Sequence, residues 1–126
     1  MLDYICEMEK SLQELLIPSY ILAHFEFEKV EELGGVYRLH LLEKHDVNHI
    51  PKGLIHKGKA VLNGFTNPIE LQTYPIKGQE AFLYLTRRRW KLIGTSESSQ
   101  NTYDFTQTGM KATKEFGAFL KEIGRG

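Results

Sequence analysis

Two pairs of strand-like segments joined by short turns constrain the fold of this chain most strongly. FEFEKVEEL and VYRLHLLEK flank Gly34-Gly35, and IELQTYPI and AFLYLTRRRW flank the residues from Lys77 to Glu80. Glycine adopts the positive φ angles that tight turns between antiparallel strands require. The polar segments 44–58 and 94–102 are expected to be loops. With a further short strand in KAVLNGF, the pattern predicts an antiparallel sheet of about five strands.

Helical periodicity appears at both ends of the chain. Near the N-terminus, Pro18 separates a first amphipathic helix, with Asp3 as its expected cap, from a short second helix. The last helix has Thr108 as its expected cap and Gly124 as its expected end. Its apolar stripe consists of Ala112, Phe116, Phe119, Leu120 and Ile123. We therefore expect an α+β fold with two N-terminal helices, the sheet, and a C-terminal helix packed on the apolar face of the sheet.

Length and cysteine content fit a single intracellular domain. The chain has 126 residues, which suits one domain over residues 1–126, and we find no repeat or linker. Its one cysteine, Cys6, excludes an intrachain disulfide. No apolar segment approaches the roughly 20 residues that span a bilayer, and the N-terminus lacks the features of a secretory signal. The sequence therefore predicts a cytoplasmic protein with no membrane partner.

The sequence contains no recognisable catalytic or cofactor-binding motif. Glycine-rich phosphate loops, the nucleophile elbow of hydrolases and the HExxH zinc motif are all absent. His45 and His49 are four residues apart with Asp46 between them, but Pro51 indicates a loop and no third ligand is evident. We therefore predict a protein without catalytic residues, metal or cofactor.

Charge is distributed unevenly, although the formal net charge is zero. Residues 1–34 contain eight acidic and two basic residues, whereas residues 35–126 contain eight acidic and fourteen basic ones. The basic excess is concentrated between Lys52 and Lys91. A neutral total therefore does not exclude a surface that binds nucleic acid.

The segment LYLTRRRWKL concentrates cations beside an aromatic ring. Three arginines and a lysine surround Trp90, and further lysines, Lys57 and Lys59 among them, come from neighbouring strands or turns. Cationic side chains displace counterions from phosphates, arginine adds bidentate contacts, and tryptophan stacks on unpaired bases. A solvated strand end, with Trp90 in the core, is the alternative. The residues predicted to bind DNA are Lys77, Arg87, Arg88, Arg89, Trp90 and Lys91.

Several motifs occur in the order and at the separations of a family of small bacterial proteins. They are LLIPSYILAHFE at 15–26, the hairpin at 26–43, YPIKGQEAFLYLTRRRW at 74–90 and TGMKATKEFGAFLKEIG at 108–124. In these features the chain resembles the N-terminal region proteins of insertion-sequence transposases, which are encoded in a short reading frame beside a separate catalytic transposase gene. The resemblance covers most of residues 15–124. Where the family commonly has Arg-Asp-Trp, this chain has Tyr103, Asp104 and Phe105.

The resemblance implies a non-enzymatic accessory of DNA transposition. The chain is too short for an RNase-H-like catalytic domain and lacks its alternating β/α pattern, so the metal-dependent chemistry is expected in a partner subunit. This chain would recognise DNA at the ends of the insertion sequence, dock the catalytic transposase subunit, or do both. The sequence leaves the oligomeric state open, a homodimer included.

A protein-interaction module with no direct DNA contact is the principal alternative. In that case the acidic N-terminal helices would dock the catalytic subunit, and the basic segment would be only a solvated surface. A small-molecule site is a third hypothesis, which predicts a closed pocket lined by convergent polar groups. The sequence offers no such set, and a deep pocket framed by His45, Asp46 and His49 would be needed to support it.

Overall fold

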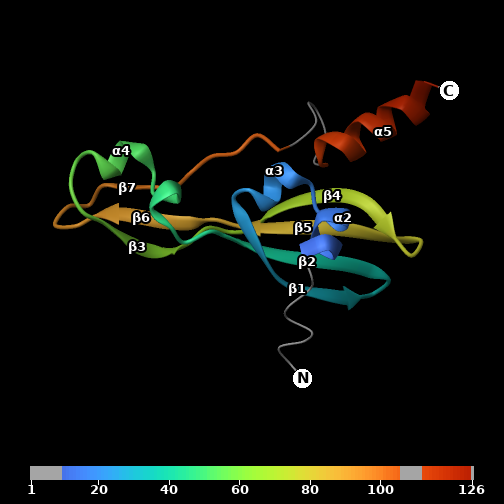
Figure 1. Cartoon of the computed structure of the whole chain (residues 1–126), viewed down its shortest axis with the longest axis horizontal. Coiled ribbons are helices and arrows are strands. Elements are labelled where there is room, and N and C mark those ends of the chain that lie inside the picture. Colours follow the sequence, from blue (N-terminus) through green and yellow to red (C-terminus); the bar gives the residue numbers. More distant parts are fainter. Residues whose placement is uncertain (1–9, 106–111, 126) are drawn as a thin grey trace.

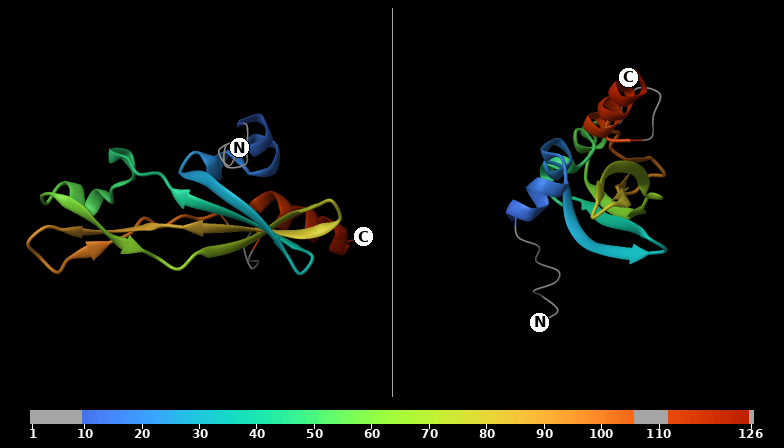
Figure 2. Two further views of the ribbon diagram at one scale, coloured as in Figure 1. Left: turned by 90° about the horizontal axis from the view of Figure 1, so that it is seen from below. Right: turned by 90° about the vertical axis from the view of Figure 1, so that its right-hand side faces the viewer.

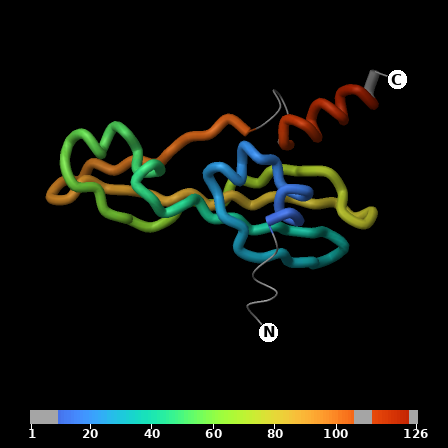
Figure 3. Tube along the Cα trace, in the orientation of Figure 1, coloured from blue at the N-terminus to red at the C-terminus, as the bar shows by residue number. Residues whose placement is uncertain are grey.

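The computed structural model describes residues 10–105 and 112–125, and within them the fold combines helices with seven strands in two sheets (Figures 1 and 3). The first half contains α2 (Lys10–Leu16), α3 (Ser19–Leu22), β1 (Phe25–Leu33), β2 (Val36–Glu43), the 3₁₀ helix η1 (Val47–His49) and α4 (Lys52–Ile55). The second half contains β3 (Ala60–Phe65), β4 (Ile69–Ile76), β5 (Gln79–Thr86), β6 (Arg88–Leu92), β7 (Ser98–Ser99) and α5 (Lys114–Arg125). The predicted mixture of helices and strands is confirmed, and its details differ.

The first sheet contains both predicted hairpins, in the strand order β1-β2-β5-β4. Gly34 and Gly35 have φ angles of 62° and 77°, and Lys77 and Gly78 have φ angles of 52° and 77°. Positive φ at both central residues is the geometry that two-residue turns between antiparallel strands prefer. The sequence pattern therefore located both turns, although Gln79 and Glu80, which were expected between the strands, already belong to β5.

The prediction of a wholly antiparallel sheet is wrong, because β2 and β5 run parallel. Leu39 is paired with Leu83 and Leu41 with Leu85, and all four side chains are buried. Hairpin signals determine only which strands pair with their neighbours in sequence. The pairing of one hairpin with the other is decided by burying the leucines of both central strands.

The prediction of one sheet of about five strands is also wrong, because β3, β6 and β7 form a separate second sheet. β5 and β6 were expected to be one strand, but the strand pattern is interrupted at Arg87. Buried residues precede the interruption at Leu83 and Leu85, and follow it at Trp90 and Leu92. The buried side chains thus change from odd-numbered to even-numbered positions. The change occurs where the chain stops pairing with β2 and β4, as β5, and starts pairing with β3, as β6.

Each sheet has its own small core under short helices. Ile17, Ile21 and Phe25 pack on the leucines of the first sheet. Leu54 of α4 packs on Trp90 and Leu92 of the second sheet. The segment 44–58 was predicted to be a loop, but it contains η1 and α4. Helices of three and four residues are too short to leave a visible period in a sequence.

The two sheets lie end to end, which makes the molecule elongated (Figures 1 and 2). α2, α3 and α5 lie at the end formed by the first sheet, and α4 lies at the other end. The predicted first helix ends before Pro18 as expected, while its start at Asp3 lies outside the described residues. No helix in the described ranges is long and apolar enough to cross a membrane.

The predicted C-terminal helix is present as α5, but only its beginning packs on the sheet. Phe116 is buried against Tyr74, with ring centroids 5.2 Å apart. Phe119 and Ile123 are 45% and 59% exposed, because α5 points away from the sheet after its first turns (Figure 1). The apolar stripe was therefore predicted correctly as helical from Phe116 onward, but Ala112 precedes the helix in a β-bridge with Gln72, and the stripe is not fully packed. Its expected cap, Thr108, lies outside the described residues.

Candidate nucleic-acid interface

The structure does not bring Lys77 together with the three arginines. Lys77 lies in the turn before β5, and Arg89 lies in β6, which continues from β5 beyond Arg87. An extended chain of this length spans roughly 40 Å. Because β5 and β6 follow one another along the molecule (Figure 1), Lys77 and Arg89 lie far apart.

Arg87 and Arg88 are directed into the joint between the two sheets. Arg87 donates from Nη1 to the main-chain oxygen of Asn101 over 3.0 Å. Arg88 donates from Nε to the main-chain oxygen of Glu43 over 2.9 Å, and its guanidinium lies 5.5 Å from the centre of the Phe65 ring. Both arginines are only partly exposed. Their guanidinium groups therefore hold the joint together.

Glu43 is the buried acceptor at the centre of this joint. Glu43 is only 1% exposed. The carboxylate accepts hydrogen bonds from the main-chain N–H of Arg88 (2.9 Å), from the amide of Asn101 (3.0 Å) and from the hydroxyl of Tyr103. Burial, and then the hydrogen bond to Glu43, raises the pKa of Tyr103 well above its ordinary value. Tyr103 therefore stays protonated and acts as a donor.

Trp90 lies in the core of the second sheet. It is 4% exposed and packs with Leu54 and Leu92. The ring of His45, an exposed residue, lies 5.6 Å from the indole centroid. Because stacking on a base requires an accessible ring face, the indole in this position serves packing.

Arg89 and Lys91 lie on the opposite face of the second sheet from Trp90, since successive side chains of a strand point to opposite faces. Lys91 is paired with Val61 of β3, and Lys59 precedes Val61 by two residues, which puts it on the same side. We call the face that carries Lys59, Arg89 and Lys91 the outer face. Figure 2 shows α4 on one side of β3 and β6 and no described helix on the other.

The whole end of the molecule around the second sheet is cationic. Residues 44–65 and 87–101 contain eight basic residues and only Asp46 and Glu97 as acidic ones. The carboxylate of Glu97 pairs with Lys57 over 2.7 Å. β3, β6 and β7 contain no acidic residue. The four glutamates of β1 belong to the first sheet, so positive and negative charge are separated along the long axis.

A chain of hydrogen bonds links Asp46, His49 and His24 near the joint. Nδ1 of His49 donates to the Asp46 carboxylate, and Nε2 of His49 lies 3.0 Å from Nδ1 of His24. The hydrogen bond from His49 lowers the pKa of Asp46. The two ring nitrogens are thus within hydrogen-bonding distance, and one imidazole donates to the other. No group of three potential ligands suited to a metal ion occurs in the described parts of the chain.

We expect the free energy of unfolding to fall as the pH is lowered from about 7.5 to about 5.5. Burial, followed by the charges of His49 and Lys44, lowers the pKa of His24 below its ordinary value of 6.5. In this pH range the unfolded chain binds more protons than the folded chain, so acid favours unfolding. Urea unfolding at the two pH values measures the effect. His24→Asn should reduce the difference, and an unchanged difference would assign the pH dependence to other groups.

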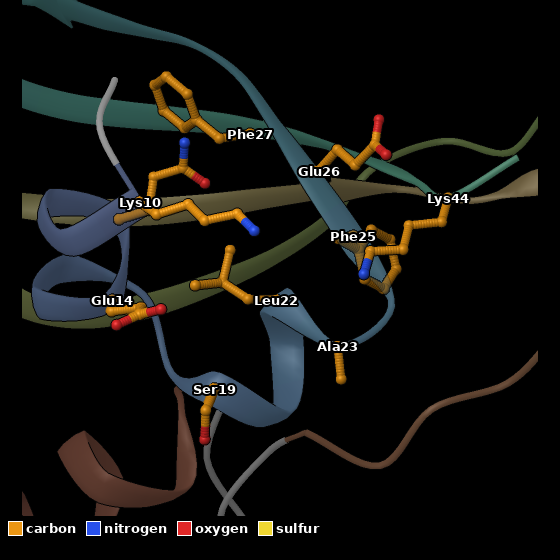
Figure 4. A pocket seen from close by; sticks show the side chains of 10 residues that line it. Lys10, Glu14, Ser19, Leu22, Ala23, Phe25, Glu26, Phe27 and Lys44 are labelled. Atoms are coloured by element: carbon orange, nitrogen blue, oxygen red, sulfur yellow. The ribbon is translucent and has the colours of Figure 1, made fainter. Parts of the chain in front are cut away.

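A cleft of about 850 Å³ lies beside α2, α3 and the start of β1 (Figure 4). Its walls combine Lys10 and Lys44 with Glu14, Leu22 and Phe27. Among the described residues, no histidine or cysteine lines it, and the segment 45–49 does not contribute to it. The small-molecule hypothesis predicted a pocket framed by His45, Asp46 and His49, and this cleft is elsewhere.

Sequence reasoning identified the basic segment but missed the residues that organise it. Glu43 was not recognised, although it continues the every-second-residue pattern of the buried Leu39 and Leu41. Asn101 was assigned to a flexible loop, although its amide also donates to the main-chain oxygen of His49 over 2.6 Å. Lys59 was recorded only as a neighbour of the basic segment. Comparisons with protein-family models, with curated proteins and with solved structures found no match for this chain.

Proposed function

We propose that this chain is a non-enzymatic, DNA-binding component of a transposition system that works beside a separate catalytic transposase. The sequence resemblance supplies the biological context, and the ends of an insertion sequence are the DNA it would bind. The observation that carries the proposal is the outer face, where Arg89 and Lys91 of β6 and Lys59, just before β3, lie beside strands that contain no acidic residue. Clustered cations of this kind bind phosphates by releasing counterions.

The roles of the predicted DNA-binding residues differ in this proposal. Arg89 and Lys91 contact the DNA backbone, and Lys59 joins them from the position just before β3. Arg87 and Arg88 act as positioning residues, because their guanidinium groups are hydrogen-bonded to main-chain oxygens in the joint. Trp90 supports the outer face from the core beneath it.

The combined change Lys59→Ala, Arg89→Ala and Lys91→Ala is expected to weaken DNA binding and its salt dependence. Each contact removed should flatten the slope of log K against log salt by about 0.9 for duplex DNA. Binding of labelled insertion-sequence ends over a series of salt concentrations measures the slope.

The matched control removes three positive charges from the first sheet and its surroundings, with Lys10→Ala, Lys29→Ala and Lys77→Asn. Asparagine is chosen for position 77 because it tolerates the positive φ of the turn. The control should keep the wild-type slope. If both triple variants flatten the slope of log K against log salt by the same amount, net charge alone is responsible and the outer face is not the binding site.

A protein-docking function is the second candidate, because apolar side chains are exposed on two helices. Leu12 and Leu15 of α2 are 48% and 79% exposed, and Phe119 and Ile123 of α5 are also exposed. These side chains would bury apolar surface against the catalytic subunit, an interaction that salt does not weaken. Co-purification with the catalytic transposase at high salt and without DNA would support this function. A complex that forms only on DNA would contradict it.

A further inference from the structure

We propose that the outer face binds the major groove of B-form duplex DNA, with β3 and β6 entering the groove as a two-stranded ribbon. This inference rests on the proposed DNA-binding function and specifies its ligand. β3 and β6 are antiparallel and paired from Ala60–Leu92 to Phe65–Arg88. A six-residue strand is about 20 Å long, and paired strands are about 5 Å apart. The major groove is about 12 Å wide and admits such a ribbon.

The outer face is suited to a duplex and unsuited to a single strand. Proteins that bind single strands offer aromatic rings on which successive bases stack. The aromatic residues of β3, β6 and β7 are Phe65 and Trp90. Trp90 is buried on the opposite face, and Phe65, which is 49% exposed, is paired with Arg88 and so lies on that opposite face as well. Neither ring is therefore available on the outer face.

The dimensions of the ribbon also select the groove. The minor groove of B-form DNA is about 6 Å wide, which is too narrow for two strands side by side. The major groove of A-form RNA is deep and narrow, so side chains cannot read it. The major groove of undistorted B-form DNA, unlike its minor groove, is wide enough for two paired strands.

In this arrangement, some side chains of the outer face contact base edges and others contact phosphates. Arg89 is the second residue of β6, and the register shift between Leu62 and Phe65 puts Asn63, an exposed residue of β3, opposite Arg89. Arginine bonds in a bidentate manner to guanine, and asparagine to adenine, in both cases through groups that include the purine N7. Lys59 and Lys91 lie nearer the other end of the ribbon and supply the phosphate contacts.

Duplexes with altered grooves test this assignment in the full-length protein. A duplex is first selected from a random-sequence pool by binding to the wild-type chain. Replacing its purines by 7-deazapurines removes the N7 acceptor from the major groove only, and replacing guanine by inosine removes the amino group from the minor groove only. We expect the 7-deazapurine duplex to bind at least about fivefold more weakly. The inosine duplex should bind as the parent duplex does, and the separated strands should bind more weakly than the duplex.

Two variants link the groove to the named side chains. Arg89→Lys keeps the charge but loses the bidentate contact, so it should bind normal and 7-deazapurine duplexes more nearly alike while keeping the wild-type salt slope. Asn63→Ala should behave similarly, with a smaller effect. Circular dichroism checks that each of these exposed substitutions leaves the fold intact.

The outcomes separate this inference from the function on which it rests. If the chain binds no DNA at any salt concentration, both are wrong. If it binds the duplex with a steep salt dependence but ignores 7-deazapurine substitution, the proposed function stands and the major-groove assignment is overturned. Tighter binding to single strands, or a loss of affinity with inosine in place of guanine, overturns the assignment as well.

Discussion

Replacing Glu43 by alanine is expected to lower the free energy of unfolding by about 3–5 kcal/mol. The residue is 1% exposed, and its carboxylate accepts hydrogen bonds from Arg88, Asn101 and Tyr103. Alanine would leave these three donors in the joint without their acceptor, and each lost partner costs about 1–3 kcal/mol when the donor stays buried. Urea unfolding followed by circular dichroism measures the change.

Two control variants isolate the network from the loss of charge and size. Glu43→Gln keeps the shape and one acceptor oxygen, so we expect a clearly smaller loss of stability. Glu97→Ala removes a glutamate from an exposed ion pair with Lys57, which is worth at most about 1 kcal/mol. If Glu43→Ala is no more destabilising than Glu97→Ala, Glu43 does not hold the two sheets together.

The joint explains why the basic segment was only partly understood from the sequence. A run of arginines beside a tryptophan predicts an exposed cationic strand end. Arg88 instead bonds to Glu43, which is 45 residues earlier in the chain. Contacts over such separations leave no periodic signal, so the direction of each guanidinium could not be predicted from local pattern.

The positions of the two turns, by contrast, could be predicted from the local sequence. Gly34, Gly35 and Gly78 have the positive φ angles that their turns require, and both hairpins form where the glycines indicated. The parallel pairing of β2 with β5 could not be deduced from either hairpin. It depends on how the apolar faces of two already formed units are buried together, which is a property of the whole chain.

The division into two sheets was missed for a related reason. Strand-like sequence continues from β5 through β6, and only Arg87 departs from the strand conformation. A single irregular residue shifts the alternation of side chains by one position, so residues after it that would have been exposed become buried, and the reverse. This exchange buries Trp90 and leaves Arg89 and Lys91 on the outer face. The candidate binding surface is therefore a consequence of one local interruption of the strand.

Replacing Trp90 by alanine is expected to lower the free energy of unfolding by about 3–5 kcal/mol. Trp90 contributes the largest side chain to a core that otherwise contains the buried Leu54 and Leu92, with Ile50 and Ala60 partly buried beside them. A core of this size cannot compensate for the cavity, so the second sheet should lose protection first in amide hydrogen exchange. DNA binding should be lost with it, because the outer face requires ordered strands.

Trp90→Leu separates packing from base stacking. Leucine refills part of the buried volume but cannot stack on a base, so the variant should fold, with a smaller loss of stability, and keep most of its DNA affinity. Stacking of the indole on a base would instead be worth about 1–3 kcal/mol of binding free energy. A folded Trp90→Leu protein with that loss of affinity would mean that the indole leaves the core on binding DNA. Unchanged affinity would restrict the contact surface to the polar side chains of the outer face.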